Sequence, residues 1–155
     1  MNPAVELGRE LAGEDGPVRL LVAHADLPAL TTDDVAALLA QDASVVVATD
    51  RHRSGTNLLL LDPPFSAPSS TGLTSSSASE RHEGRARQTF RFRFGTGSLD
   101  AHLAEAERAG ARAVVVQRPG TATDLDTVDD WGELPAEVRA VVGRHVPGLH
   151  GGTTG

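Results

Sequence analysis

Short apolar runs recur along the chain, separated by stretches in which apolar residues return at helical spacing. Runs of four apolar residues predict strands that are buried on both faces. They lie within residues 18–23, 44–49, 57–61 and 113–117. From Phe90 to Phe94, phenylalanine alternates with arginine, and this pattern predicts a fifth strand with only one face buried.

Helical patterns fill most of the intervals between these runs. They predict helices over residues 2–12, from Thr31 onward, over 99–109, near 129–131 and over 135–142. Thr31 and Asp34 have the spacing of a capping box, and Gly110 stands where a helix stop is expected. Because strands and helices alternate, the predicted fold class is an α/β layered sheet.

The length of 155 residues suits one domain. One interval does not fit a compact domain, because residues 63–88 are rich in Ser, Pro, Gly and charged residues and hold almost no large apolar side chain. We expect this interval to be a mobile, Ser-rich insertion. The predicted organisation is therefore one domain over residues 1–147, interrupted by the insertion, and a disordered tail over residues 148–155.

Composition narrows the classes of function. The formal net charge of −7 argues against broad nucleic-acid binding, which needs a basic surface. The chain has no cysteine, so disulfides, thiol catalysis and cysteine-type zinc sites are ruled out. No apolar run is long enough to span a bilayer and no signal-peptide pattern is visible, so we expect a cytoplasmic protein.

Three aspartates are candidate metal ligands. Asp26 follows the first predicted strand, and ligands of open α/β sheets bind at the carboxyl ends of strands. Asp124 and Asp126 are two positions apart, a spacing that directs both carboxylates to the same side of an extended segment. Such a pair suits Mg²⁺, which favours one or two carboxylates together with phosphate oxygens. Each of these sites could equally be an ordinary acidic turn.

Two loops could bind a small anion. Phe94-Gly95-Thr96-Gly97-Ser98 is a glycine-rich turn that leads into a helix, where free backbone N–H groups attract phosphate; Ser98 could donate to the ligand or simply cap the helix. The loop of residues 50–57 places basic side chains after a strand, but it could also be a solvated hairpin turn. His24, His52 and His102 lack metal-ligand spacing, and we expect each to lie on the surface or behind a site.

Taken in order, the motifs resemble one enzyme family. They are A-D-L-P-x-L at residues 25–30, D-R-x-x-x-G-T-N at 50–57, F-x-F-G-x-G-S at 92–98 with His102-Leu103, and T-D-L-D-T at 123–127. This series resembles the phosphoenolpyruvate/2-phospho-L-lactate guanylyltransferases of coenzyme F-420 biosynthesis, over about residues 2–135. The resemblance implies a nucleotidyltransferase fold of the molybdopterin-guanylyltransferase (GT-A) type, a three-layer structure.

The resemblance also implies roles for particular residues. Asp26, Asp124 and Asp126 match the family's Mg²⁺-binding, catalytic aspartates. Thr56, Gly95 and Ser98 match positions that hold the phosphoacid, the first two through their backbone. The implied reaction transfers GMP from GTP to phosphoenolpyruvate or 2-phospho-L-lactate and releases pyrophosphate.

The chain also departs from the family pattern. Met1 falls inside a stretch that the family places after its triphosphate loop and first βα units, so we expect an amino-terminal segment to be missing. Two further interpretations follow: a non-catalytic remnant that keeps the phosphoacid and Mg²⁺ half-site, or a nucleotidyltransferase of this fold with another phosphorylated substrate. The F-G-x-G-S segment argues against the second. A homo-oligomer is possible.

Overall fold

The structure, a computed structural model, describes residues 1–63, 65 and 89–145. Apart from Pro63 and Phe65, the predicted Ser-rich insertion lies outside these residues, as does the predicted tail. Along the chain, the described elements are a helix, a strand, a helix, two strands, a helix, a strand and three helices. They are α1 (Asn2–Ala12), β1 (Leu20–Ala23), α2 (Thr32–Leu39), β2 (Val45–Thr49), β3 (Thr56–Leu61), α3 (Ser98–Ala109), β4 (Ala113–Val116), α4 (Pro119–Ala122), α5 (Val128–Glu133) and α6 (Ala136–Val142).

The four strands form one mixed sheet in the order β1-β3-β2-β4. β3 is antiparallel to both of its neighbours, and β2 is parallel to β4. β1, β2 and β4 therefore all run in the same direction, and their carboxyl ends meet at one edge of the sheet. Every residue of β2 and β3 is buried, as their continuous apolar runs predict.

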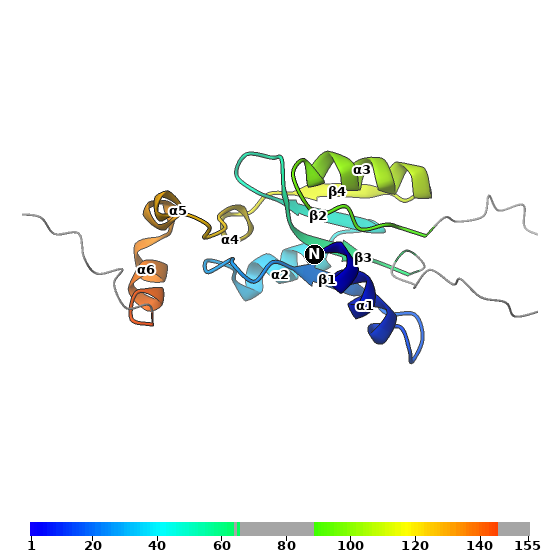
Figure 1. The fold of residues 1–155 in the computed structure, drawn as a ribbon, viewed down its shortest axis with the longest axis horizontal. Coiled ribbons are helices and arrows are strands. Elements are labelled where there is room, and N and C mark those ends of the chain that lie inside the picture. Colours follow the sequence, from blue (N-terminus) through cyan, green and yellow to red (C-terminus); the bar gives the residue numbers. More distant parts are fainter. Residues whose placement is uncertain (64, 66–88, 146–155) are drawn as a thin grey trace, which may run out of the picture.

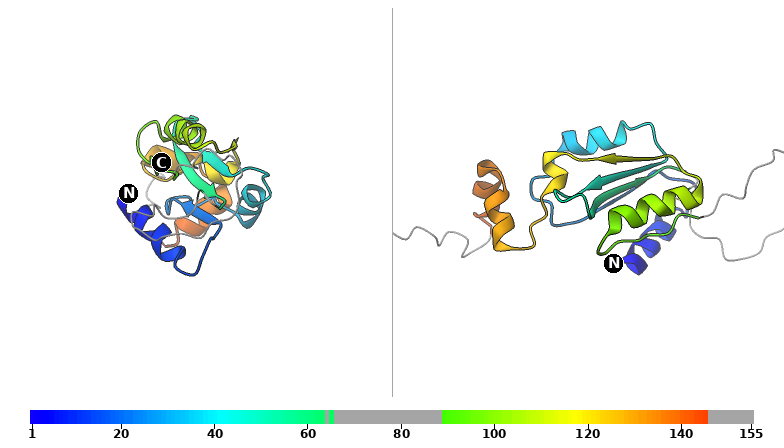
Figure 2. Two further views of the ribbon diagram at one scale, coloured as in Figure 1. Left: turned by 90° about the vertical axis from the view of Figure 1, so that its right-hand side faces the viewer. Right: turned by 90° about the horizontal axis from the view of Figure 1, so that it is seen from above.

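Helices cover both faces of the sheet, which gives the predicted three layers. α1 and α3 lie on one face and α2 lies on the other (Figures 1 and 2). α2 begins with the predicted capping box, in which the Thr31 hydroxyl accepts from the Asp34 N–H and the Asp34 carboxylate accepts from the Thr31 N–H. α3 ends at Gly110 in the left-handed conformation, also as predicted. α5 and α6 lie beyond the end of the sheet to which β4 leads (Figure 1).

The prediction of a strand over residues 90–94 is wrong, although its burial pattern is right. The three phenylalanines are buried in the core between the sheet and α3, and the two arginines are exposed. Side chains take the place of a neighbouring strand, since the Arg91 N–H donates to Glu105 Oε1 (2.8 Å) and the Arg93 N–H donates to His102 Nε2 (2.9 Å). The alternation of apolar and polar residues indicates which face of the segment is buried, but it does not indicate which groups form hydrogen bonds with its backbone.

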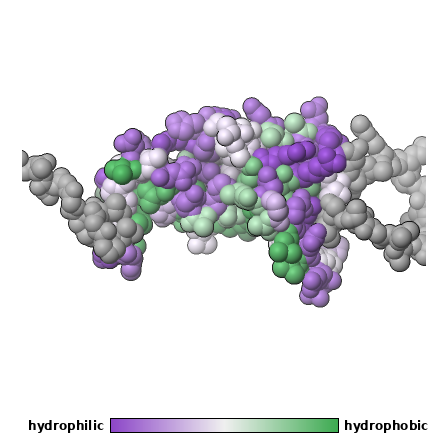
Figure 3. Space-filling view, viewed as in Figure 1, coloured by the Kyte–Doolittle hydropathy of each residue, from purple (hydrophilic) through white to green (hydrophobic). Residues whose placement is uncertain are grey.

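α1 is joined to this segment through a buried arginine. Arg9 is 1% exposed, donates to the Phe90 carbonyl at 2.7 Å and pairs with Glu6. Its guanidinium also lies 4.9 Å from the centre of the Phe92 ring, within the range of a cation–π contact. The opposite side of α1 presents Leu7 and Leu11 to solvent, and a hydrophobic patch lies over this helix in Figure 3. None of the described helices combines the length and apolar character that crossing a membrane requires.

Candidate functional site

A pocket of about 420 Å³ lies where the carboxyl ends of β1 and β2 meet the start of β3. This is the edge of an open α/β sheet at which ligands bind. The segment 94–98, one residue of the loop that follows α4 and Met1, at the start of α1, complete the wall. The lining residues are Met1, His24, Asp50, Gly55, Thr56, Asn57, Phe94, Gly95, Ser98 and Asp124.

The structure brings together Thr56, Gly95 and Ser98, the three residues to which the family resemblance assigns phosphoacid binding. They come from β3, from the glycine-rich turn and from the first residue of α3. The Thr56 N–H donates to Ser98 Oγ at 2.9 Å, so this N–H is already used within the protein. Since Oγ accepts from Thr56, the Ser98 hydroxyl keeps its own proton for another acceptor.

Two glycines shape the turn that leads into α3. Gly95 has φ +137° and Gly97 has φ +69°, which are backbone conformations that residues with a side chain rarely adopt. Gly97, and not Ser98, is the N-cap of α3, so the capping role considered for Ser98 is wrong. The N–H groups of Ser98 and Leu99 donate to backbone carbonyls within the protein. These two N–H groups are therefore not free to bind an anion, contrary to expectation.

The turn between β2 and β3 is held by the Asp50 carboxylate, which accepts from the N–H groups of Ser54 and Gly55, both at 2.9 Å. Burial by itself raises the pKa of Asp50, but the hydrogen bonds from Ser54 and Gly55 outweigh it and lower that pKa. A Cβ at Gly55 would lie 2.8 Å from Asp50 Oδ2, so only glycine fits against this carboxylate without a shift. Arg51 pairs with Asp130 at 2.7 Å and does not line the pocket. The turn therefore shapes the wall but directs no arginine into the pocket.

The three predicted metal ligands are only partly brought together. The Leu125 N–H donates to the Asp26 carbonyl at 2.9 Å, so the D-L-D segment lies against Asp26. Asp124 lines the pocket, whereas Asp126 is exposed and its N–H donates to Asp130. Among the described residues, no group of three acidic, His or Cys side chains is close enough to hold a metal ion. Metal binding by these aspartates remains a prediction.

The negative charges around the pocket favour a ligand that binds together with a cation. Asp50 and Asp124 line it, and no arginine is among the lining residues of this described pocket. Asp26 Oδ1 is buried without a hydrogen-bond partner in the described part of the chain, and His24 Nδ1 lies 3.9 Å from it. A buried carboxylate oxygen without a partner is costly. Carboxylate oxygens such as this one and those of Asp124 are ligands that Mg²⁺ accepts, and Mg²⁺ needs only one or two of them when phosphate and water supply its other ligands.

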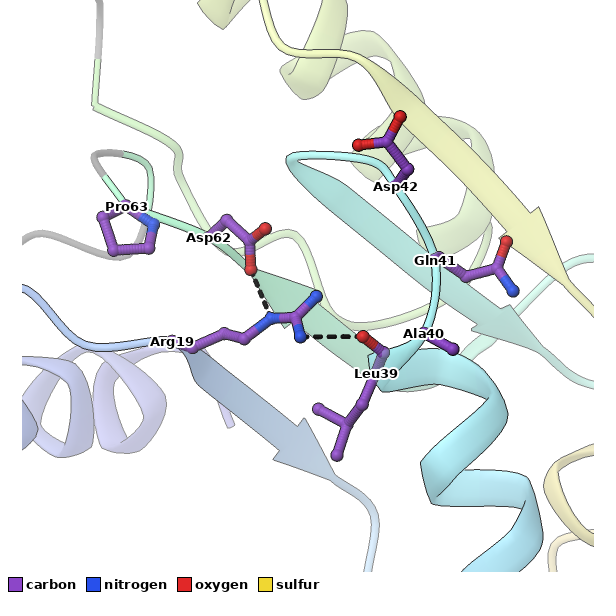
Figure 4. Close-up of a pocket in the computed structure, with 7 residues that line it drawn as sticks. All are labelled: Arg19, Leu39, Ala40, Gln41, Asp42, Asp62 and Pro63. Carbon is purple, nitrogen blue, oxygen red and sulfur yellow. Dashed lines mark hydrogen bonds and ion pairs between the residues drawn. The ribbon is translucent and has the colours of Figure 1, made fainter.

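A second depression of about 630 Å³ lies at the opposite ends of the strands (Figure 4). Its arginine, Arg19, donates to Asp62 and to the Leu39 carbonyl, so it joins β1 to the end of β3 and to α2. Asp42, on its rim, pairs with Arg112. The polar groups of this depression are occupied in holding the elements together.

Some residues of the pocket had no role of their own assigned from the sequence. Asn57, which the motifs include only as part of the 50–57 loop, donates to the Thr121 carbonyl and lines the wall. His24 lines the wall from the end of β1. His102 was expected on the surface or behind a site, and it is fully buried behind Thr56, with its Nδ1 2.9 Å from Thr56 Oγ1. The spacing of four residues between Ser98 and His102 could have indicated this position, because residues four apart in a helix lie on the same face.

The fold and pocket define a class: an α/β protein with a polar site at the carboxyl ends of its parallel strands. No family model matches the chain. Similar curated proteins include the phosphoenolpyruvate guanylyltransferases of three bacteria. That of Rubrobacter xylanophilus is 39% identical over 139 residues (88% of this chain, 57% of the relative). Those of Conexibacter woesei (35% over 137 residues; 86% and 51%) and Sphaerobacter thermophilus (32% over 136 residues; 86% and 55%) follow.

The resemblance inferred from the motifs is thereby confirmed: this chain is a homologue of the phosphoenolpyruvate guanylyltransferases, a family of nucleotidyltransferases. It spans about half the length of the curated relatives that it matches.

Proposed function

We propose that this chain forms the phosphoacid- and Mg²⁺-binding part of a guanylyltransferase that acts on phosphoenolpyruvate or 2-phospho-L-lactate in coenzyme F-420 biosynthesis. The observation that carries the proposal is the meeting of Thr56, Gly95, Ser98 and Asp124 in one pocket at the ligand-binding edge of the sheet. The names of the relatives support the choice of phosphoenolpyruvate and of a guanylyl group. The architecture is proposed to be that of the molybdopterin-guanylyltransferase (GT-A) type.

In the proposed reaction, a phosphate oxygen of the phosphoacid attacks the α-phosphorus of GTP. A new P–O–P bond forms, the bond between the α-phosphorus and the α,β-bridging oxygen breaks, and pyrophosphate leaves. Mg²⁺ would neutralise the phosphates and align them. The residues of this chain would hold the phosphoacid, with the Ser98 hydroxyl as a donor and Asp26 and Asp124 on the metal side; Asp126 belongs to the proposed metal set by resemblance.

The alternative, a non-catalytic remnant, differs in what it binds. Among the described residues that line the pocket, no arginine supplies the positive charge that a triphosphate needs, and this supports a half-site. A half-site binds phosphoenolpyruvate with Mg²⁺ and does not bind GTP. A complete enzyme binds both and releases pyrophosphate.

Calorimetry and a pyrophosphate assay on the 155-residue chain separate these outcomes. We expect Mg²⁺-dependent binding of phosphoenolpyruvate, with 2-phospho-L-lactate titrated in parallel. Asp124→Asn should weaken this binding at least tenfold, the scale expected for a charge-assisted interaction. Asp129→Asn, the same change at an exposed residue outside the pocket, is the matched control. Phosphoenolpyruvate binding that does not depend on Mg²⁺ and is unchanged in Asp124→Asn would refute the proposed site. Phosphoacid-dependent release of pyrophosphate would refute the half-site alternative.

A further inference from the structure

His102 links the wall of the pocket to the segment that carries the glycine-rich turn. The ring is fully buried in α3 and contacts the rings of Phe90 and Phe94. Each ring nitrogen has one polar partner: Nδ1 lies 2.9 Å from Thr56 Oγ1, and Nε2 accepts from the Arg93 N–H at 2.9 Å. Through its two polar contacts, the histidine therefore joins Thr56, which lines the pocket, to Arg93, which immediately precedes the turn.

The partner of Nε2 decides the tautomer. A backbone N–H can only donate, so Nε2 must carry a lone pair, and in the neutral ring the proton then resides on Nδ1. Nδ1–H consequently donates to Thr56 Oγ1. A protonated ring would place an N–H against the Arg93 N–H, and burial opposes that state by lowering the pKa of His102 to about 4.

This arrangement sets the direction of the hydrogen bonds around Thr56. Its hydroxyl accepts from His102, so its own proton is left to donate to another acceptor. Its N–H donates to Ser98 Oγ, which likewise leaves the Ser98 proton to donate. Donors that accept a hydrogen bond from behind are polarised by it and donate more strongly. Two hydroxyl donors with protons to offer suit a phosphate or carboxylate group.

We infer that His102 is a positioning residue of the phosphoacid pocket: as the Nδ1–H tautomer it holds Thr56 so that the hydroxyls of Thr56 and Ser98 both donate to the bound anion. The inference rests on the proposed function. It assigns His102 no contact with the ligand, because the ring is completely buried.

Two substitutions separate the two ring nitrogens. In His102→Asn, the side-chain amide occupies the place of Nδ1 and can donate to Thr56, while the Arg93 N–H loses its acceptor. In His102→Gln, the longer side chain offers an oxygen at the place of Nε2, and Thr56 loses its donor. Each variant removes one buried hydrogen bond, so a merely structural histidine predicts similar losses of stability and similar affinities in both.

The experiment measures phosphoenolpyruvate binding with Mg²⁺ by calorimetry, and urea unfolding, for the wild type and both variants. We expect His102→Gln to weaken binding about three- to tenfold and His102→Asn to stay within about twofold, the range that one hydrogen bond supplies. Thr56→Val combined with His102→Gln should bind no more weakly than Thr56→Val alone. Nitrogen-15 NMR of the wild type should report a proton on Nδ1.

The outcomes are distinguishable. Wild-type binding with equal losses in both variants, or a proton on Nε2, overturns the role of His102 and leaves the proposed function in place. If the wild type does not bind phosphoenolpyruvate with Mg²⁺, the proposed function fails and the role of His102 fails with it.

Discussion

The buried histidine predicts an unusual dependence of stability on pH. Burial lowers the pKa of His102 from 6.5 to about 4. The nearby charge of Glu105 raises this pKa and that of Arg93 lowers it, each by less than burial does. In the unfolded chain the same imidazole takes up a proton near pH 6.5. Between these values the unfolded state binds one proton more than the folded state, so the free energy of unfolding falls as the pH falls.

The size of the effect follows from the two pKa values. The contribution of His102 is complete above about pH 6.5 and is lost as the pH drops toward 4. At about 1.4 kcal/mol per pH unit, the free energy of unfolding should fall by about 2 kcal/mol between pH 7 and pH 5 through this residue. Asp34, Asp50, Glu105 and Asp130 have lowered pKa values, and their contributions are lost only at more acid pH.

Urea unfolding followed by circular dichroism at pH 7, 6 and 5 measures this slope. His102→Asn cannot titrate, so its stability should change by about 2 kcal/mol less than that of the wild type over this range. His52→Asn, a change at an exposed histidine of the β2–β3 turn, is the matched control and should follow the wild type. Parallel pH profiles for the wild type and His102→Asn would refute the reasoning, because the buried ring would then titrate as it does in water.

Two further changes test the packing around the site. Gly120→Ala places a Cβ 2.5 Å from the Ala29 carbonyl and 2.1 Å from Asp34 Oδ2, so it should lower the free energy of unfolding by about 1–3 kcal/mol in urea unfolding, whereas Gly132→Ala, with nothing within 4 Å, should not. Glu105→Gln weakens the acceptor of the Arg91 N–H and removes the charge that pairs with Arg108, so it should cost about 1–3 kcal/mol and speed hydrogen exchange at residues 90–94. If Glu105→Gln exchanged at residues 90–94 at the wild-type rate, the segment would be held by apolar packing alone.

The sequence by itself predicted the elements whose signals are local. The capping box of Thr31 and Asp34 and the glycine stop at Gly110 involve atoms within a few residues of one another, so spacing alone predicts them. The continuous apolar runs likewise predicted the two central strands. The motif set also indicated the enzyme family, and the order of elements indicated an α/β sheet.

Tertiary structure decided how the backbone and side chains of distant segments meet. It made residues 90–94 an extended segment paired with side chains of α3, although alternation alone predicted a strand. It placed Asp124 in the pocket and left Asp126 exposed, although their spacing alone treated them alike. It also buried His102 behind Thr56. These outcomes depend on hydrogen-bond partners that lie far along the chain, and periodicity carries no information about such partners.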